Sequence, residues 1–263
     1  MLEFETLVYL GVQKTGSRFI KRFLRRFVAF PEVANSNGMP RAQRKEGALH
    51  VISVRHPMSQ YLSLYSYGCE GRGWLRERMN SLGHADMYSG DIDGFARWLE
   101  LVVAPEAAFS GDKGFGFHST RFLLMALPGY PQHLRGAELH DAIKTIFSAR
   151  AITDVVLKQE TLNGDLSRLV GEHSGLFRDH EGAIAYLAAD DRINVSPKRG
   201  IDPENLPMEI RSAVRSREWL LFDLLGYQQD LRGQRRIGAR RIFGAGAPGK
   251  MDLGPIAGAP PRS

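Results

Sequence analysis

The chain contains almost no cysteine: Cys69 is the single one among 263 residues. An intramolecular disulfide is therefore excluded, and a small disulfide-stapled secreted scaffold is not expected. No apolar run approaches the roughly 18 residues that a membrane-spanning helix needs. The first residues carry acids where a secretion signal has a basic region. These absences together predict a cytoplasmic protein that is not integral to a membrane.

Net positive charge is absent from most of the chain, although the whole chain carries +6. Residues 232–263 hold seven Lys or Arg against one Asp, and residues 1–231 are balanced. No nucleic-acid partner is therefore expected, and any anion site in the folded part must be local. With 11 Gly or Pro in 32 residues and no periodic apolar pattern, segment 232–263 is predicted to be a disordered basic tail.

Residues 1–231 are predicted to form one α/β domain. Short β-rich apolar segments indicate buried strands at 5–12, 49–54 and 151–158, and a short strand near 31–34 fits the same pattern. Apolar residues recur at helical spacing between them, which predicts helices at 19–28, 57–67, 92–103, 119–126, 135–149, 160–174 and 207–226. This alternation favours a three-layer α/β/α fold with a central parallel sheet.

The segment LGVQKTGSRF joins the first predicted strand to the first helix. Gly11 and Gly16 keep the spacing of the phosphate loop G-x-x-x-x-G-K-[ST], but Ser17 occupies the lysine position and the lysine is Lys14. The N–H groups at a helix start, together with the helix dipole, favour a bound anion. Three interpretations stay open here: a kinase-type loop that has lost its lysine, an ordinary strand–helix connection, and a loop for a different anion.

A second segment, VISVRHPMSQYLSLYSYG, places Arg55 at the end of another buried strand. Ser63 follows eight residues later, on the next predicted helix. Ligands of open α/β sheets bind at the carboxyl ends of strands, so Arg55 would lie beside the glycine loop if the two strands are neighbours. An arginine fork and a hydroxyl could then hold one phosphate. Taken singly, Arg55 can equally be an ion-pair partner and Ser63 an ordinary helix residue.

Together the two segments resemble the sulfotransferases that use 3′-phosphoadenosine 5′-phosphosulfate (PAPS). The family's first motif, which binds the 5′-phosphosulfate, matches Lys14, Thr15, Gly16, Ser17 and Arg18. Gln13 replaces its common proline. The second motif, which binds the 3′-phosphate, matches Arg55, Pro57, Ser63 and Tyr65, with His56 where Asp or Asn is common. Weaker similarity covers residues 155–166 and 193–200, where the family's late basic loop corresponds to Lys198, Arg199 and Gly200.

The resemblance implies a P-loop-like fold and an enzyme that moves a sulfuryl group from PAPS to a hydroxyl. PAPS would be the co-substrate, and no metal is implied. The motif spacing is closer to glycan-type members, so a carbohydrate is the expected acceptor. Lys14 would stabilise the leaving phosphate oxygen, and the main-chain N–H groups of Gly16 and Ser17 would share that role.

The general base that would take the acceptor's proton is less well marked. The family uses a His or Glu after the first helix, and Glu32 occupies about that place. His56, His118 and Glu46 are the alternatives, and each of the four can equally be structural. Glu160, which follows the third predicted strand, is interpreted as an architectural residue.

Two other functions compete with the sulfotransferase. A kinase-like phosphotransferase requires magnesium, and Asp154 is the aspartate that the pattern leaves for holding it. A non-catalytic nucleotide-binding module requires no base, and it is favoured if Glu32 lies far from the loop.

Overall fold

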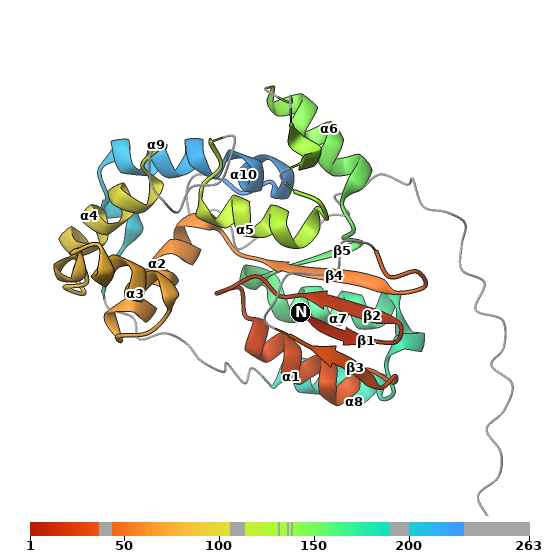
Figure 1. Cartoon of the computed structure of the whole chain (residues 1–263). Helices are drawn as coiled ribbons and strands as arrows, with labels where there is room; N and C mark the ends of the chain where they lie inside the picture. The colour runs from red at the N-terminus through yellow and green to blue at the C-terminus, as the bar shows by residue number, and fades with distance from the viewer. Residues whose placement is uncertain are drawn as a thin grey trace, which may run out of the picture.

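The computed structural model describes residues 1–36, 44–105, 114–130, 132–135, 137, 139–189 and 200–228. Over these residues the chain forms a five-stranded sheet with helices packed around it (Figure 1). The predicted tail at 232–263 lies outside the described residues. None of the helices in the described part has the length and apolar character needed to cross a membrane.

The sheet is mixed, whereas the sequence predicted a parallel one. Its strands are β1 (Leu2–Phe4), β2 (Leu7–Leu10), β3 (Glu32–Asn35), β4 (Leu49–Val54) and β5 (Val155–Lys158), in the order β3-β1-β2-β4-β5. Strands β2, β4 and β5 are parallel, and β1 runs antiparallel to both β2 and β3. The single strand predicted at 5–12 is observed over a shorter range as β2, and β1 before it was not predicted. Polar Glu5 and Thr6 interrupt the apolar run, and the chain reverses there into a hairpin.

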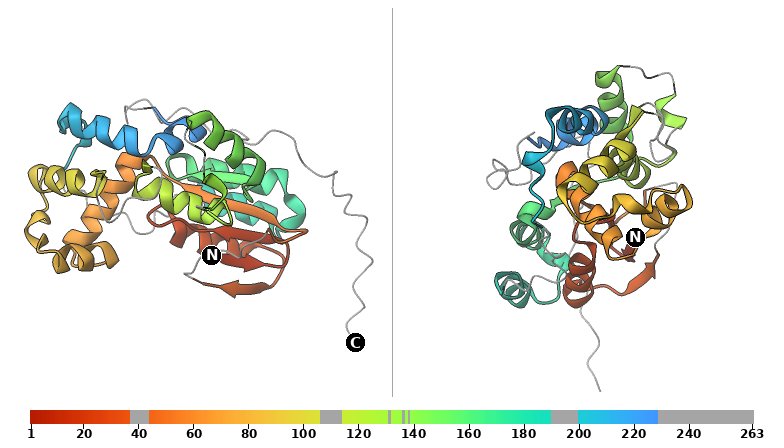
Figure 2. Two further views of the ribbon diagram at one scale, coloured as in Figure 1. Left: turned by 45° about the horizontal axis from the view of Figure 1, so that its top comes forward. Right: turned by 90° about the vertical axis from the view of Figure 1, so that its left-hand side faces the viewer.

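Helices cover both faces of the sheet, because side chains alternate along each strand. Val8 and Leu10 of β2 pack with α5 (Phe117–Ala126), α6 (His140–Arg150) and α10 (Trp219–Leu225). Leu7 and Tyr9 face the other way, onto α1 (Ser17–Phe27), α7 (Leu162–Glu172) and α8 (His180–Ala188). Figures 1 and 2 show these two helical groups on opposite sides of the strands. The α/β class and the covered sheet predicted from the sequence are therefore observed.

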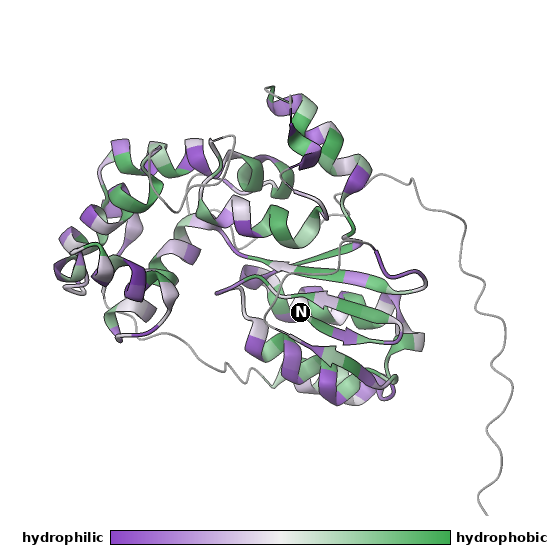
Figure 3. Cartoon of the chain, viewed as in Figure 1, coloured by the Kyte–Doolittle hydropathy of each residue, from purple (hydrophilic) through white to green (hydrophobic). Residues whose placement is uncertain are grey.

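Helix α1 shows why the chain folds this way next to the loop. Its buried residues are Phe19, Ile20, Phe23, Leu24 and Phe27. Its basic residues face outward, and its exposed turns are coloured hydrophilic in Figure 3. The residue before the helix, Gly16, is left-handed and supplies no side-chain cap. The helix therefore starts without a side-chain acceptor from its capping residue.

A third group of helices packs beyond the carboxyl end of β4 (left in Figure 1). It contains α2 (Pro57–Cys69), α3 (Trp74–Ser81), α4 (Ile92–Val103) and α9 (Met208–Arg217). The sequence did not predict α3 or α8, and the single helix predicted at 207–226 is two helices, α9 and α10. Short 3-10 turns complete the described chain: η1 (Ala85–Met87), η3 (Gln132–Leu134), η4 (Gln159–Thr161), η5 (Ser174–Leu176) and η6 (Pro203–Asn205).

Glu218, at the break between α9 and α10, connects this break to helices α2 and α5. Its carboxylate is 0% exposed and accepts from the Tyr61 hydroxyl, from the main-chain N–H of His118 at 3.0 Å and from that of Ser119 at 2.7 Å. It therefore caps α5, whose own preceding residue, Gly116, has no side chain to do so. Burial is the main cause that raises the pKa of Glu218. The close approach of Gly116 to this carboxylate leaves no room for a Cβ atom.

We predict that Glu218→Ala lowers the free energy of unfolding by about 3 kcal/mol, because three buried donors lose their acceptor. Glu218→Gln, which keeps one acceptor oxygen, loses less. Glu100→Ala, at an exposed position of α4, is the matched control and changes stability by less than about 0.5 kcal/mol. Urea unfolding measures all three, and equal effects for Glu218→Ala and Glu100→Ala would contradict the role of the carboxylate.

Candidate anion-binding site

The two sequence motifs meet at one end of the sheet. The loop at residues 11–16 leaves the carboxyl end of β2 and enters α1. Strand β4 is the parallel neighbour of β2, with Leu10 opposite Ile52, so Arg55 follows directly beside the loop. The Arg55 guanidinium donates from Nη1 to the Lys14 carbonyl at 3.4 Å. The condition set by the sequence, that the two strands be neighbours, is met.

Hydrogen bonds of buried hydroxyl groups connect the loop to strands β2 and β4. Thr15 is fully buried, and its Oγ1 donates to the Val12 carbonyl at 2.7 Å and lies 2.5 Å from Ser53 Oγ on β4. Ser53 Oγ lies 2.6 Å from the Tyr9 hydroxyl on β2. Ser17 Oγ donates to the same Val12 carbonyl at 2.8 Å. Both hydroxyls predicted to bind a ligand thus point into the loop in this structure, and they fix its shape.

The loop backbone forms a concave row of donors. Lys14 has φ 67° and Gly16 has φ 86°, and Lys14 is the one non-glycine residue with positive φ in the described part of the chain. Within that part, the main-chain N–H groups of residues 14–17 donate to no protein acceptor. Left-handed residues alternating along a turn make such nests, which bind anions. Gly16 is required here, because a Cβ would lie 3.1 Å from Leu162 as well as meeting the positive φ.

Several cations converge on Lys14. Its ammonium lies 4.2 Å from the centre of the Tyr67 ring on α2, and Arg72 covers the same ring at 4.7 Å. Burial is the main cause that lowers the pKa of Lys14 from 10.5 to about 8, and the charges of Arg55, Arg72 and Arg18 contribute to this shift. Among the residues that the structure describes, no carboxylate offsets these causes. The site therefore favours a ligand that brings negative charge.

Arg55 is the second cation of the site. Its Nε is buried and has no hydrogen-bond partner within the described part of the chain. Burial lowers the pKa of this guanidinium, and the Glu160 carboxylate partly offsets the effect. Glu160 itself accepts from the His56 main-chain N–H at 2.8 Å and from the Tyr227 hydroxyl at 3.2 Å. Glu160 thereby fixes the β4–α2 junction and stands opposite Arg55.

The remaining residues of the second motif lie on α2. Ser63 is buried on this helix, Pro57 is its first residue, and the Tyr65 hydroxyl donates to the Met87 carbonyl at 3.0 Å. Of the late basic turn, Gly200 has φ 71°. Lys198 and Arg199 lie outside the described residues.

Glu32 does not lie at the loop. It starts β3, which is separated from β2 by β1, and its register partner is Phe4, at the end of β1 away from the loop. The carboxylate accepts from Arg25 Nε at 2.8 Å and Nη2 at 3.0 Å, and these bonds lower its pKa. A base must reach the acceptor hydroxyl, so the position of Glu32 argues against the role that the sequence suggested.

The other three candidate bases differ in position. Glu46 is exposed and precedes β4, at the amino end of the strand. His56 is buried on the Arg55 side, its Nε2 lies 2.9 Å from the Gln228 carbonyl, and burial lowers its pKa to about 4. His118 is buried against Tyr61, and burial lowers its pKa well below 6.5. Both histidines are therefore neutral at pH 7.

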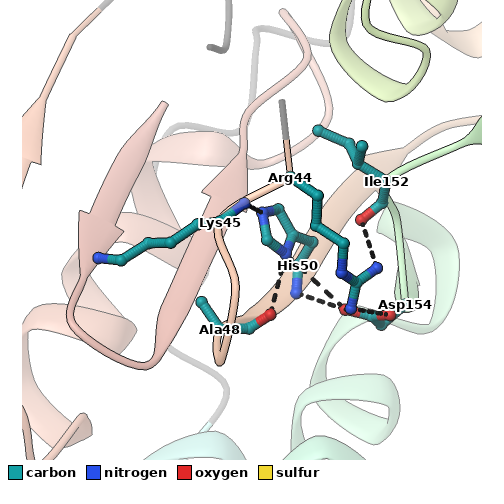
Figure 4. A network of polar contacts seen from close by, with 6 residues as sticks. All are labelled: Arg44, Lys45, Ala48, His50, Ile152 and Asp154. Carbon is teal, nitrogen blue, oxygen red and sulfur yellow. Dashed lines mark hydrogen bonds and ion pairs between the residues drawn. The ribbon is translucent and has the colours of Figure 1, made fainter. Parts of the chain in front are cut away.

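Asp154, the candidate magnesium ligand, lies at the amino end of β5, away from the loop. Figure 4 shows its carboxylate in a network with Arg44 and His50. Arg44 Nη2 is 2.7 Å from both carboxylate oxygens, and the His50 main-chain N–H donates to Oδ2 at 2.8 Å. Arg44 Nη1 also donates to the Ile152 carbonyl at 3.2 Å. An aspartate engaged in this way ties β4 to β5 and is not placed to hold a metal at the loop.

Sequence reasoning missed the residues that complete the site. Tyr67 and Arg72 flank Lys14, and Gln60 Nε2 donates to the Gln13 carbonyl at 2.7 Å. Ser53 gave no signal, because a serine inside an apolar strand carries no motif. The sequence places Gln60 and Tyr67 on the helix predicted at 57–67. Their contacts with the loop, however, follow only from the packing of α2 against it.

Comparison with known proteins leaves the site to be judged on its geometry. No family model matches the chain, and no curated protein or solved structure matches it. The loop offers free N–H groups, a partly buried ammonium and a neighbouring guanidinium. These groups suit a phosphate or sulfate group.

The charge state of Lys14 can be tested without a ligand. Competitive acetylation across a pH series, read by mass spectrometry, should give Lys14 a midpoint near pH 8, because only the neutral amine reacts. Lys144 is the internal control, since its bond to Asp141 raises its pKa above 10.5. A Lys14 profile that coincides with that of Lys144 would show that the cations do not converge as described.

The backbone at Lys14 gives a second test. We predict that Lys14→Gly is more stable than Lys14→Ala by about 1 kcal/mol, because alanine keeps the left-handed strain and glycine does not. The same pair at Arg22, an exposed interior position of α1, should show the opposite sign by about 1 kcal/mol. Urea unfolding measures the stability of the four variants. If the glycine and alanine variants ranked in the same order at both positions, the predicted strain at Lys14 would be contradicted.

Proposed function

We propose that the protein is a sulfotransferase that uses PAPS as co-substrate and acts on a hydroxyl acceptor, for which a carbohydrate is the proposed class. The observation that supports it is the contact between the glycine loop and Arg55. Lys14 and the loop N–H groups suit a 5′-phosphosulfate, and Arg55 with Ser63 suits a 3′-phosphate. The P-loop-like form of the α/β fold belongs to the same proposal.

The proposed reaction transfers a sulfuryl group directly. The acceptor oxygen forms a bond to sulfur while the bond from sulfur to the bridging phosphate oxygen breaks, and the acceptor proton goes to a base. Negative charge develops on the leaving phosphate, where the Lys14 ammonium and the loop N–H groups stabilise it. The lowered pKa of Lys14 suits this role, because the approaching anion favours the charged lysine. Adenosine 3′,5′-bisphosphate and the sulfated acceptor are the products.

Two features weigh against a kinase-type loop. The hydroxyl of Ser17, at the position where such loops carry lysine, bonds back to Val12. Asp154, the candidate magnesium ligand, is held by Arg44 at the opposite end of its strand. ATP with magnesium is therefore not the proposed ligand.

A non-catalytic module that binds the same nucleotide is the second candidate. The observation that favours it is the distance of Glu32 from the loop in sheet order and its engagement with Arg25. Such a module would use the same cations to bind the nucleotide and would carry out no transfer.

Nucleotide binding separates these functions. Calorimetric titration should show metal-independent binding of adenosine 3′,5′-bisphosphate, weakened about 10- to 150-fold in Lys14→Ala and in Arg55→Ala, the range expected for one lost charge-assisted hydrogen bond. Lys144→Ala, on the surface of α6, is the control and should bind like the wild type. Stronger binding of ATP–magnesium would refute the proposal.

Transfer itself is read with ³⁵S-labelled PAPS and a panel of glycan acceptors. Labelled product that is lost in Lys14→Ala supports the enzyme. Tight binding of the bisphosphate without labelled product on any acceptor of the panel supports the binding module instead.

A further inference from the structure

Within the described residues, several buried polar atoms have no hydrogen-bond partner. Among them are Nε of Arg55, at the end of β4, Nδ1 of the adjacent His56, and Nε2 of His118, in the first turn of α5. His118 is 2% exposed. An unpartnered buried donor costs free energy, so it commonly marks a place where a ligand completes the bonding.

The His118 ring is fixed in place by its neighbours. Its centre lies 4.1 Å from that of Tyr61 on α2, the helix that begins two residues after Arg55. The main-chain N–H of His118 donates to the buried Glu218 carboxylate at 3.0 Å, which also accepts from the Tyr61 hydroxyl. Glu218 thus holds the backbone and the facing ring, and leaves the imidazole Nε2 for another group.

The charge of Arg55 also acts on the His118 imidazole. Burial is the main cause that lowers the pKa of His118, and the charges of Arg55 and then Arg121 lower it further. A neutral imidazole can donate one hydrogen bond to a ligand, and because it carries no charge it does not repel the neighbouring guanidinium. It is a weak base at neutral pH, so its position suits ligand binding better than proton removal.

We infer that His118 Nε2 and Arg55 Nε donate to one anionic group, which completes a binding pocket between the β4–α2 junction and the first turn of α5. This inference rests on the proposed function, under which the group is the 3′-phosphate of the nucleotide. His118 lies outside both sequence motifs and would be a specificity-determining residue, since it binds the phosphate that distinguishes this nucleotide from adenosine 5′-monophosphate.

The test compares two ligands that differ only in this phosphate. Calorimetry gives the affinity ratio of adenosine 3′,5′-bisphosphate over adenosine 5′-monophosphate. His118→Phe should lower this ratio about 10-fold, the effect of one hydrogen bond to a charged group, and should leave the monophosphate affinity unchanged. His118→Gln, which carries an amide donor at a similar reach, should restore most of the ratio.

Tyr61→Phe is the matched control, because it removes a hydroxyl from the Glu218 cluster and keeps the ring against His118. It should leave the ratio unchanged although it lowers stability. In the wild type, ¹⁵N NMR of the histidine side chains should show the His118 Nε2 signal moving with the bisphosphate and not with the monophosphate.

The outcomes separate this inference from the proposed function. A wild-type preference for the bisphosphate that His118→Phe retains, with an unmoved His118 signal, overturns the role of His118 alone. A wild type without any preference overturns both. If His118→Phe does not fold, the Gln variant and the NMR signal of the wild type decide.

Discussion

The hydrogen bond between Thr15 and Ser53 is the contact on which the candidate site depends. It joins the glycine loop to β4, and the Tyr9 hydroxyl completes the link to β2. Because all three side chains are buried, water cannot compete for these bonds. The link holds Lys14 in a left-handed conformation that a free loop would avoid, and it keeps the loop N–H groups turned outward.

The fixed loop brings positively charged side chains close together, and their repulsion lowers the stability of the folded state. Burial and the charges of Arg55, Arg72 and Arg18 lower the pKa of Lys14, and Glu160 is the carboxylate that stands opposite Arg55. A site of this kind is strained in both backbone and charge, and an anionic ligand relieves the charge. The buried and unpartnered Nε of Arg55 fits the same pattern. Stability and ligand binding are therefore expected to oppose each other at Lys14.

Local patterns predicted the elements near the site, and long-range pairing decided the rest. The amphipathic run of α1, Pro57 at the start of α2 and the apolar run of β4 are local signals, and each matched the structure. The hairpin at Glu5 and Thr6 was missed because β1 has only three residues, Leu2–Phe4, which are too few to show a strand period. That hairpin inserts β1 between β2 and β3 and so carries Glu32 away from the loop.

The sequence by itself determined the loop's glycines, the lysine within it, and the arginine at the end of another strand, because these follow from spacing along a few residues. The tertiary structure decided that the two strands are neighbours. Tertiary structure decided which candidates share the site. It turned Thr15 and Ser17 inward, placed Asp154 and Glu32 at the far ends of their strands, and set His118 against the start of α2. Residues 100 positions apart, such as His118 and Glu218, meet through packing that no local pattern encodes.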